Sequence, residues 1–386
     1  MAKPLSFYAV CPLGLETMLA DELVAAGGKI YKTERGGVAF DGDMEAAMRA
    51  CLTSRLASRI LMRLGSSDYR DAEDIYNFAC RTKWENYFDA SQTFRVDINA
   101  HRSPLQSLDF ALLRIKDGIC DRFVHFFEKR PDVERAHPDI RVFAYVSERF
   151  CTFYLDLCGE ALFKRGWRED KGEAPLKENL AAALLKLAGW TPDTPLQDTF
   201  CGSGTIAIEA AQIACNMAPG LKRHFLFENF ADFDKELWQE IKDDALAAVN
   251  ISSIVVEKAR ENARKAGLGA LLDDGRLTFK QCDARKAEPA TAAGLLISNP
   301  PYGEQSNPKS ASVAAMMKDV ADNLKHHFAG WTAWLLTSDR LLPRQMRLSE
   351  SRKVPLMNGP LECRFFKFDL VAGSMKRTPK AQLTAQ

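Results

Sequence analysis

The sequence predicts an α/β protein: a doubly wound sheet in the C-terminal half, preceded by a separate α+β region. The chain has 386 residues, which exceeds one domain of roughly 150 residues. Apolar segments of strand length alternate with amphipathic helical segments from about residue 176. A glycine turn between a strand and a helix is typical of nucleotide-binding sites in such folds. We expect α+β domains at 1–65 and 66–158, a linker at 159–175, an α/β domain at 176–373 and a basic tail at 374–386.

The composition is that of a globular protein, with 46% apolar and 27% charged residues and a net charge of +1. No apolar run approaches the roughly 18 residues that cross a bilayer. Acidic residues at 16, 21 and 22 argue against a leader peptide. The ten cysteines include no C-x-x-C pair, so neither a metal site nor a disulfide framework is expected. We expect a cytoplasmic protein without membrane or metal partners. The sequence does not indicate an oligomeric state.

The N-terminal half alternates strands and helices. Its expected elements are strand 7–10, helix 14–26, strand 37–40, helix 49–64, helix 72–78, strand 93–98, helix 105–127 and strands 140–147 and 151–156. In the long helix, the spacing of Phe110, Leu113, Ile119 and Phe123 predicts a core-facing side.

A stripe of arginines gives this half a candidate phosphate surface. Arg55, Arg59 and Arg63 recur every four residues, which predicts one stripe of the 49–64 helix. A charged run at 164–168 predicts an exposed hinge. Phosphate contact and an ordinary solvated face are equally compatible with this pattern. The candidate nucleic-acid contacts are Arg55, Arg59, Arg63, Lys164 and Arg165.

The C-terminal half repeats strand and helix with short connections. Its expected elements are helix 176–188, strand 196–200, helix 204–216, helices 234–247 and 254–266, strand 276–281, strand 294–298, helix 312–328, strand 331–337 and strand 363–371. This alternation favours a ligand site at the carboxyl ends of the strands.

The first such strand end carries an acidic residue and a tight glycine turn. Gly202 and Gly204 let the backbone approach a ligand closely, and the N–H groups of the following helix face it. The spacing is too tight for G-x-G-x-x-G, and no lysine makes the turn a P-loop. We expect cofactor contacts from Asp198, Phe200, Cys201, Gly202, Ser203, Gly204 and Thr205.

Two later strand ends supply further candidates. Asn250 lies where an acidic residue would accept from ribose hydroxyls, and an amide makes a weaker acceptor there. Asp283, followed by Ala284, is placed to accept from an adenine amino group. A simple helix N-cap is nearly as good an interpretation of Asp283.

The most specific motif is Asn299-Pro300-Pro301-Tyr302, directly after an apolar strand. An amino group conjugated to a ring is a weak nucleophile, because its lone pair is delocalised. The Asn299 side chain and the Pro300 carbonyl can accept its N–H groups as charge develops. The prolines fix the loop, and Tyr302 offers a face for a base. We interpret these four residues as catalytic, in methyl transfer to a planar amino group.

These motifs resemble those of class I methyltransferases that modify exocyclic amino groups. The whole chain is similar to the RlmL-like bacterial 23S ribosomal RNA guanine-N2-methyltransferases. Residues 11–16 and 55–60 resemble the family's ferredoxin-like unit and THUMP RNA-binding domain. Residues 163–168, 174–182 and 361–364 resemble its linker, its next helix and its last strand.

The resemblance implies a definite activity. S-adenosylmethionine would be the cofactor, and a guanine N2 in 23S rRNA, or in a large-subunit precursor, would be the substrate. Some members carry a second methyltransferase behind this one, and the chain length leads us to expect none here. Two positions depart from the family: Asn250 replaces the usual aspartate, and Gln305 replaces a common arginine.

Two alternatives remain open. The catalytic loop would also serve an adenine-N6 DNA methyltransferase, although the N-terminal half resembles an RNA module and shows no helix-turn-helix signal. Alternatively, weakened cofactor binding through Asn250 would leave an RNA-binding scaffold.

Overall fold

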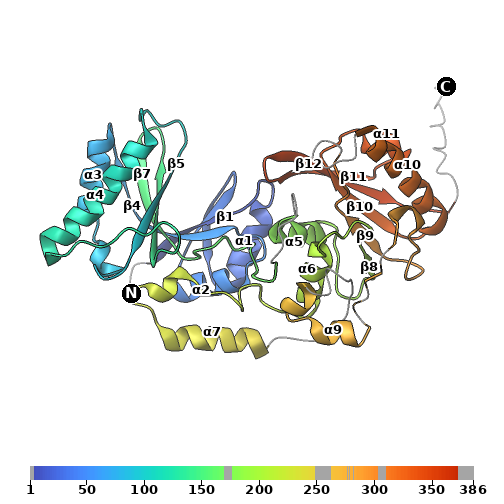
Figure 1. The fold of residues 1–386 in the computed structure, drawn as a ribbon, viewed down its shortest axis with the longest axis horizontal. Coiled ribbons are helices and arrows are strands. Elements are labelled where there is room, and N and C mark those ends of the chain that lie inside the picture. The colour runs from blue at the N-terminus through green and yellow to red at the C-terminus, as the bar shows by residue number, and fades with distance from the viewer. Residues whose placement is uncertain are drawn as a thin grey trace, which may run out of the picture. The chain divides into compact units, whose positions relative to one another are not determined.

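The computed structural model describes residues 4–168, 176–247, 262–275, 277, 279–280, 282–302 and 310–372. Its contacts divide the chain into two compact units (Figure 1). Of the described residues, unit 1 contains 4–168, 177–180 and 215–247, and unit 2 contains 176, 181–214 and those from 262 onward. No helix in these ranges is long and apolar enough to span a membrane.

Unit 1 is built on one seven-stranded sheet in the order β2-β3-β1-β4-β7-β6-β5. The strands are β1 (Leu5–Val10), β2 (Lys29–Glu34), β3 (Gly37–Gly42), β4 (Arg59–Asp68), β5 (Phe94–Ala100), β6 (Ile140–Val146) and β7 (Phe150–Asp156). Only β5 and β6 pair in parallel. The ten-residue β4 pairs with β1 and with β7, so the predicted boundary at residue 65 falls inside a continuous strand.

The helices of unit 1 begin at capping residues. Asp43, Asp71 and Ser107 each accept a backbone N–H of the first turn that follows, which fixes where α2, α3 and α4 start. The helices are α1 (Glu16–Ala25), α2 (Met44–Thr53), α3 (Ala72–Arg81), α4 (Leu108–Phe127) and α7 (Lys235–Ala247), with short 3-10 turns η1 (Trp84–Asn86) and η2 (Leu226–Asn229).

The predicted helix 49–64 is wrong. Helix α2 ends at Thr53, and the chain turns before β4 begins at Arg59. The cause is Glu22 of α1, whose Oε2 accepts from the Ser54 hydroxyl at 2.7 Å and from the amides of Arg55 and Leu56 at 3.1 Å each. A tertiary carboxylate therefore takes the N–H groups that would continue the helix.

The predicted core face of α4 is partly wrong. Ile119 and Phe123 are buried, but Phe110 and Leu113 are 56% and 48% exposed. Ala111 and Ile115 are buried in their place, on the side that packs closely against α3, where a Cβ added at Gly118 would lie 2.7 Å from the Ala79 Cβ. The buried residues of the helix are Ala111, Ile115, Gly118, Ile119, Cys120, Arg122 and Phe123.

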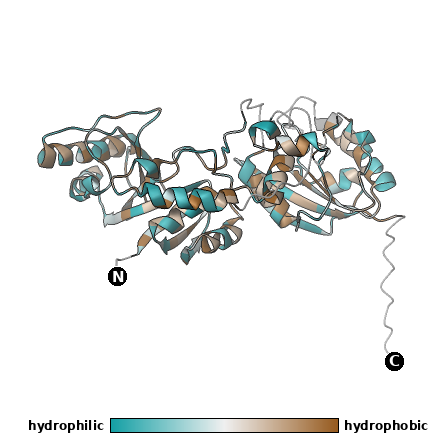
Figure 2. Ribbon diagram, turned by 90° about the horizontal axis from the view of Figure 1, so that it is seen from below, coloured by the Kyte–Doolittle hydropathy of each residue, from teal (hydrophilic) through white to brown (hydrophobic). Residues whose placement is uncertain are grey.

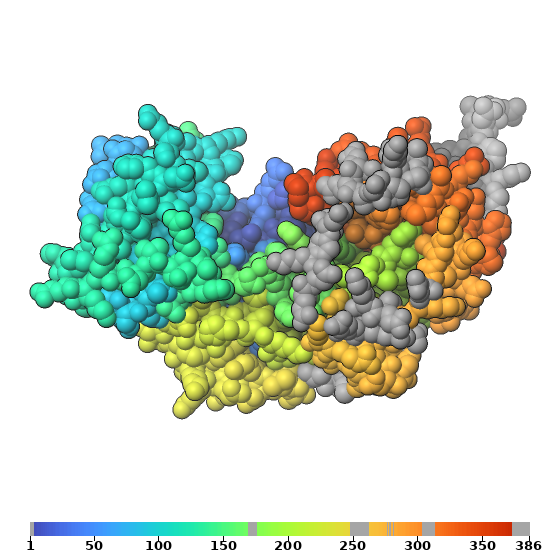
Figure 3. All heavy atoms as spheres, in the orientation of Figure 1, coloured from blue at the N-terminus to red at the C-terminus, as the bar shows by residue number. Residues whose placement is uncertain are grey.

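Residues 215–247 belong to unit 1, although they fall inside the predicted domain 176–373. The Gly220 amide donates to the Leu52 carbonyl at 2.9 Å, and the Ala231 amide donates to Tyr87 at 2.8 Å. Helix α7 of this segment lies on the surface of the unit (yellow in Figure 3). The segment packs in unit 1, where its backbone groups find partners at the end of α2 and just after η1.

Unit 2 contains a five-stranded sheet in the order β11-β12-β10-β9-β8. Strand β9 pairs in parallel with β8 and with β10. Strand β12 pairs antiparallel with β10 and with β11. The strands are β8 (Leu196–Gln197), β9 (Leu295–Ser298), β10 (Thr332–Thr337), β11 (Arg352–Asn358) and β12 (Leu361–Asp369). The mixed Rossmann-like sheet confirms the predicted fold class.

The helices of unit 2 are α5 (Glu178–Leu187), α6 (Thr205–Ala214), α9 (Gly269–Asp273), η3 (Ala284–Lys286), α10 (Ser310–His327) and α11 (Leu342–Met346). Hydrophobic and hydrophilic residues alternate along the elements of each unit (Figure 2). The first three residues of α5 group with unit 1. The sequence did not predict β2, α11 or β11. The described residues of predicted strand 276–281 form no strand, and helix 254–266 lies mostly outside the described residues.

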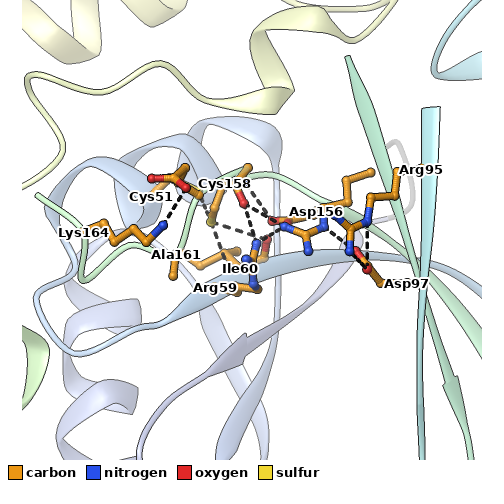
Figure 4. A network of polar contacts seen from close by, with 12 residues as sticks. Cys51, Arg59, Ile60, Arg95, Asp97, Asp156, Cys158, Ala161 and Lys164 are labelled. Carbon is orange, nitrogen blue, oxygen red and sulfur yellow. Dashed lines mark hydrogen bonds and ion pairs between the residues drawn. The ribbon is translucent and has the colours of Figure 1, made fainter. Parts of the chain in front are cut away.

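A buried carboxylate joins the middle strands of unit 1 (Figure 4). Asp156, at the end of β7, is 1% exposed and pairs with Arg59 of β4. Its other oxygen accepts from the Cys158 amide at 2.9 Å, and Arg141 of β6 lies 3.8 Å away. Burial raises the pKa of Asp156, and both guanidinium groups oppose that rise.

We predict that Asp156→Ala lowers the free energy of unfolding by about 3 kcal/mol, because it leaves the Arg59 charge without its buried partner. Urea unfolding monitored by circular dichroism measures this. Asp74→Ala is the matched control, since its pair with Arg70 is exposed to water and contributes little. Equal effects of the two substitutions would contradict the prediction.

Candidate active site

The two predicted motifs of unit 2 meet at one edge of its sheet. Strands β8 and β9 pair in parallel, with Leu196 opposite Leu295 and Gln197 opposite Leu296. Asp198 and Asn299 follow the two strands directly. Ligands of open α/β sheets bind at such adjacent carboxyl ends. The fold therefore brings the glycine turn and the Asn-Pro-Pro-Tyr loop together.

Ser298 links the two motifs. Its side chain is fully buried, its hydroxyl donates to Asp198 Oδ1 at 2.7 Å, and it accepts from the Thr199 amide at 3.0 Å. Sequence reasoning missed this residue. The available signal was a polar side chain at the end of a buried strand, because buried hydroxyl groups require partners.

The Asp198 carboxylate has a perturbed pKa. Burial raises it to about 6, while hydrogen bonds from the Ser298 hydroxyl and the Phe200 amide, the latter at 3.0 Å, oppose the rise. The group is therefore mostly ionised at pH 7 and becomes neutral in mildly acidic solution. Beside the glycine turn, its negative charge can pair with an ammonium group of a ligand.

The glycine turn depends on backbone conformations that favour glycine. Gly202 and Gly204 have φ values of 50° and 81°. A Cβ added at Gly202 would meet no atom within 4 Å, so its conformation, and not lack of space, explains the glycine. The Gly204 amide donates to the Cys201 carbonyl at 2.7 Å, and α6 begins at Thr205. The turn thus presents a helix start to a ligand.

The Asn299 loop is held by a chain of side-chain hydrogen bonds. The Tyr302 hydroxyl donates to Asn299 Oδ1 and accepts from Asn358 Nδ2 at 3.4 Å. Because the Asn358 amide nitrogen can only donate, the tyrosyl proton must go to Asn299, which orients that carboxamide. An amide oxygen has two lone pairs, so Asn299 can accept from one further donor. Asn358, at the end of β11, was not predicted.

Tyr302 is more buried than its predicted role as a base platform suggests. Its side chain is only 8% exposed, and burial together with the neighbouring Cys363 thiol raises its pKa. Pro300 is buried and Pro301 is partly buried. We infer that the tyrosine acts mainly by orienting Asn299.

The remaining predicted cofactor residues differ in their placement. Phe200 and Ala284 pack against the hydrophobic core beside α10. Asp283 caps η3 by accepting from the Arg285 amide at 2.9 Å, and the ion pair with that arginine lowers its pKa to about 2. The structure thus shows the N-cap of Asp283, and its contact with adenine stays a prediction. Asn250 and Gln305 lie outside the described residues.

Two of the five predicted RNA contacts are engaged inside unit 1. Arg165 is 3% exposed and donates to the Leu162 and Arg55 carbonyls at 2.7 and 2.8 Å. Arg59 is committed to Asp156 and to the Gly159 carbonyl at 2.7 Å. We therefore assign both arginines a structural role, because their guanidinium groups already have internal partners.

The other three predicted contacts retain access to solvent. Arg55 donates to the Met217 carbonyl at 2.5 Å, and Lys164 pairs with Glu160 at 2.7 Å. Arg63 is exposed on β4. RNA contact by these residues stays a prediction. Among the residues described, no three metal-ligating side chains cluster.

A Rossmann-like sheet with an acidic strand end, a glycine turn and an Asn-Pro-Pro-Tyr loop defines a class I methyltransferase. Comparison with known proteins is consistent with this. The chain belongs to the family of RMKL-like methyltransferase domains, whose model matches residues 165–367. Residues 6–61 match the RlmL ferredoxin-like domain and residues 69–156 match the THUMP domain.

Curated relatives are named ribosomal RNA large subunit methyltransferase K/L. The protein of Syntrophotalea carbinolica is 36% identical over 96% of this chain and 54% of its own length. That of Aliivibrio salmonicida is 38% identical over 92% of this chain and 52% of its own length. The chain therefore spans about half the length of these relatives.

Two solved structures are similar to this one over nearly the whole chain. The protein SMU.472, solved in complex with SAH, is 28% identical with a TM-score of 0.85, covering 97% of this chain and 100% of that one. A Listeria monocytogenes protein named a predicted N6-adenine-specific DNA methylase is 28% identical with a TM-score of 0.83, covering 95% and 97%.

We predict that Ser298→Ala raises the pKa of Asp198 above 6, because the lost hydroxyl donates to the charged carboxylate. Carbon NMR of aspartate labelled at the carboxyl group follows the titration. Ser203→Ala is the control, since the Ser203 hydroxyl lies 3.3 Å from that of Thr205 in the same turn. An unchanged Asp198 titration in the Ser298 variant would refute the link.

Proposed function

We propose that this methyltransferase transfers a methyl group from S-adenosylmethionine to the exocyclic N2 amino group of a guanine in 23S rRNA. The observation that carries the proposal is the oriented Asn299 carboxamide beside Asp198 at the carboxyl edge of the sheet. The THUMP match and the names of the relatives support ribosomal RNA as substrate. The SAH bound to SMU.472 supports the cofactor.

The residues at the glycine turn fit this cofactor. S-adenosylmethionine carries an ammonium group and a carboxylate on its amino-acid portion, together with a sulfonium methyl. The ionised Asp198 suits the ammonium group, and the start of α6 suits the carboxylate. When bound, the cofactor supplies the electrophilic methyl group.

Asn299 supplies the polar contact that the amino group requires. Its oxygen already accepts from Tyr302 and has a second lone pair for an N–H of the base. The Pro300 carbonyl is the second predicted acceptor. Positive charge develops on the base nitrogen during transfer, so fixed acceptors stabilise the transition state more than the ground state. The chain from Asn358 through Tyr302 orients this acceptor before the base binds.

Methyl transfer from tritiated cofactor identifies the substrate. We expect label in 23S rRNA from cells lacking the gene, in the form of N2-methylguanosine on nucleoside mass spectrometry. Genomic DNA from the same cells is the parallel substrate, because the name of the Listeria protein points to adenine in DNA. Label confined to DNA would overturn the proposal. If calorimetry detects no heat of S-adenosylmethionine binding, that result would instead favour an RNA-binding scaffold.

We predict that Asn299→Ala lowers kcat at least about a hundredfold, in line with the loss of one transition-state hydrogen-bond acceptor. Cofactor and RNA affinities stay nearly unchanged, because the acceptor acts mainly in the transition state. Single-turnover rates and separate binding titrations measure the two effects. Asn323→Ala is a control asparagine, bonded at 2.8 Å to the Ala287 carbonyl. Half of the original rate in the Asn299 variant would refute its role.

We predict that cofactor affinity falls as the pH is lowered from 7.5 to 5. The pKa of Asp198 is raised to about 6, so the carboxylate is ionised above that value and neutral below it. Only the ionised form attracts the ammonium group. Asp198→Asn binds weakly and with little pH dependence in this window. Calorimetry across the range tests this, and an identical slope in the two proteins would contradict it.

A further inference from the structure

A pocket opens on the sheet of unit 1, remote in sequence from the catalytic loop. It has a volume of about 200 Å³. Ligand pockets for drug-sized molecules are larger, at about 300–1,000 Å³, so this one suits a single planar ring system. Its lining combines three tyrosines with two cations and one carboxylate, and comprises Phe7, Tyr8, Tyr31, Lys32, Glu34, Ala39, Arg63, Thr152 and Tyr154.

Strand register explains why these residues gather. Tyr8 of β1 lies opposite Ala39 of β3, which in turn lies opposite Lys32 of β2. Arg63 of β4 lies opposite Tyr154 of β7. Neighbouring strands present directly opposed residues on the same face. A bulge between Ile30 and Lys32 adds Tyr31 to the group.

The tyrosines form a preformed aromatic surface. The rings of Tyr8 and Tyr154 are 6.5 Å apart and inclined at 53°. Gly37 makes room for the Tyr8 ring, because a Cβ there would lie 2.5 Å from its Cζ atom. Tyr31 is 50% exposed at the edge. Outward faces of antiparallel sheets are usually polar, so aromatic rings on this one require an explanation.

The charged groups of the pocket favour an anionic ligand with a polar ring. The Arg63 side chain is exposed and makes no ion pair or hydrogen bond within the described part of the chain. Lys32 pairs with Glu34 at 2.7 Å, and both remain exposed to solvent. The net charge of the lining is positive, and the Glu34 carboxylate can accept the N–H groups of a base.

We propose that this pocket captures one unpaired nucleotide of an RNA strand, with its base against Tyr8 and Tyr154 and its phosphate at Arg63. Aromatic faces bind bases of any sequence by stacking, and arginine contributes the phosphate contact. A nucleotide presents a planar base and a phosphate side by side, as this lining requires. The inference rests on the proposed function in taking RNA as the substrate, but it concerns binding in unit 1 and not methyl transfer.

Binding of a fluorescent five-nucleotide adenosine RNA to the full chain, without cofactor, tests the proposal by anisotropy at low salt. We expect Tyr154→Ala and Tyr8→Ala each to weaken binding at least about fivefold, as one lost stacking contact implies. Tyr154→Phe retains the affinity. We expect Arg63→Ala to reduce the slope of log affinity against log salt concentration by about one, as the loss of one phosphate contact implies.

Three controls make the test specific. Tyr76→Ala removes a tyrosine of α3 whose ring centroid lies 3.9 Å from the Cζ atom of Arg114 of α4. We expect this variant to bind the RNA as tightly as the wild type. A blunt RNA hairpin binds the wild type and the tyrosine variants equally. Adenosine monophosphate binds far more weakly than the five-nucleotide RNA. Thermal melting confirms that each variant is folded.

Unchanged affinity of both alanine variants for the five-nucleotide RNA would overturn the inference, as would an equal loss of hairpin binding. Monophosphate binding as tight as that of the oligonucleotide would replace RNA with a free nucleotide and also overturn it. Methylation of rRNA is measured separately. Its absence, with pocket-dependent RNA binding intact, would refute the proposed function and leave the pocket standing.

Discussion

The contact between the buried Asp156 carboxylate and Arg59 ties together the middle strands of unit 1. It lies where β4, β7 and β6 meet, and its carboxylate also fixes the chain that leaves β7 through the Cys158 amide. A buried carboxylate persists only with partners that offset its desolvation. The residues matched by the ferredoxin-like and THUMP models share one sheet. Strand β4 begins inside the first match, ends just before the second, and pairs with a strand of each.

In the candidate active site, too, a buried polar group is held by partners on a neighbouring strand end. Ser298 is buried between the ends of β8 and β9, and each of its hydrogen bonds reaches the neighbouring strand end. The contacts from Asn358 through Tyr302 then set the direction of the Asn299 oxygen. Both arrangements place polar groups before any ligand binds, which is what electrostatic preorganisation requires.

The two units contribute different chemistry to the proposed activity. Unit 2 holds an acidic group, a glycine turn and an oriented amide, for which we propose a cofactor and an amino group as ligands. Unit 1 holds tyrosines and exposed cations on an open sheet face, for which we propose an unpaired base and its phosphate. The separation lets substrate binding and methyl transfer be measured independently.

The candidate catalytic loop could be located from the sequence because its pattern is local. Asn299 to Tyr302 are consecutive, and Asp198, Gly202 and Gly204 lie within seven residues, so strand ends and turn conformations follow from neighbouring residue types. The fold class followed from the alternation of strands and helices. The tertiary structure alone could show that the two motifs meet through Ser298 and that Asn358 orients the loop.

Long-range contacts decided what local patterns could not. The arginine stripe at 55, 59 and 63 has helical spacing, but Glu22 on another helix ends that helix at Thr53. The segment 215–247 follows the methyltransferase helix in sequence and yet packs in unit 1. The sequence by itself determined the fold class and indicated the candidate reacting groups. Tertiary packing determined which charges are structural and which tyrosines share a pocket, because buried polar groups take the partners that folding brings to them.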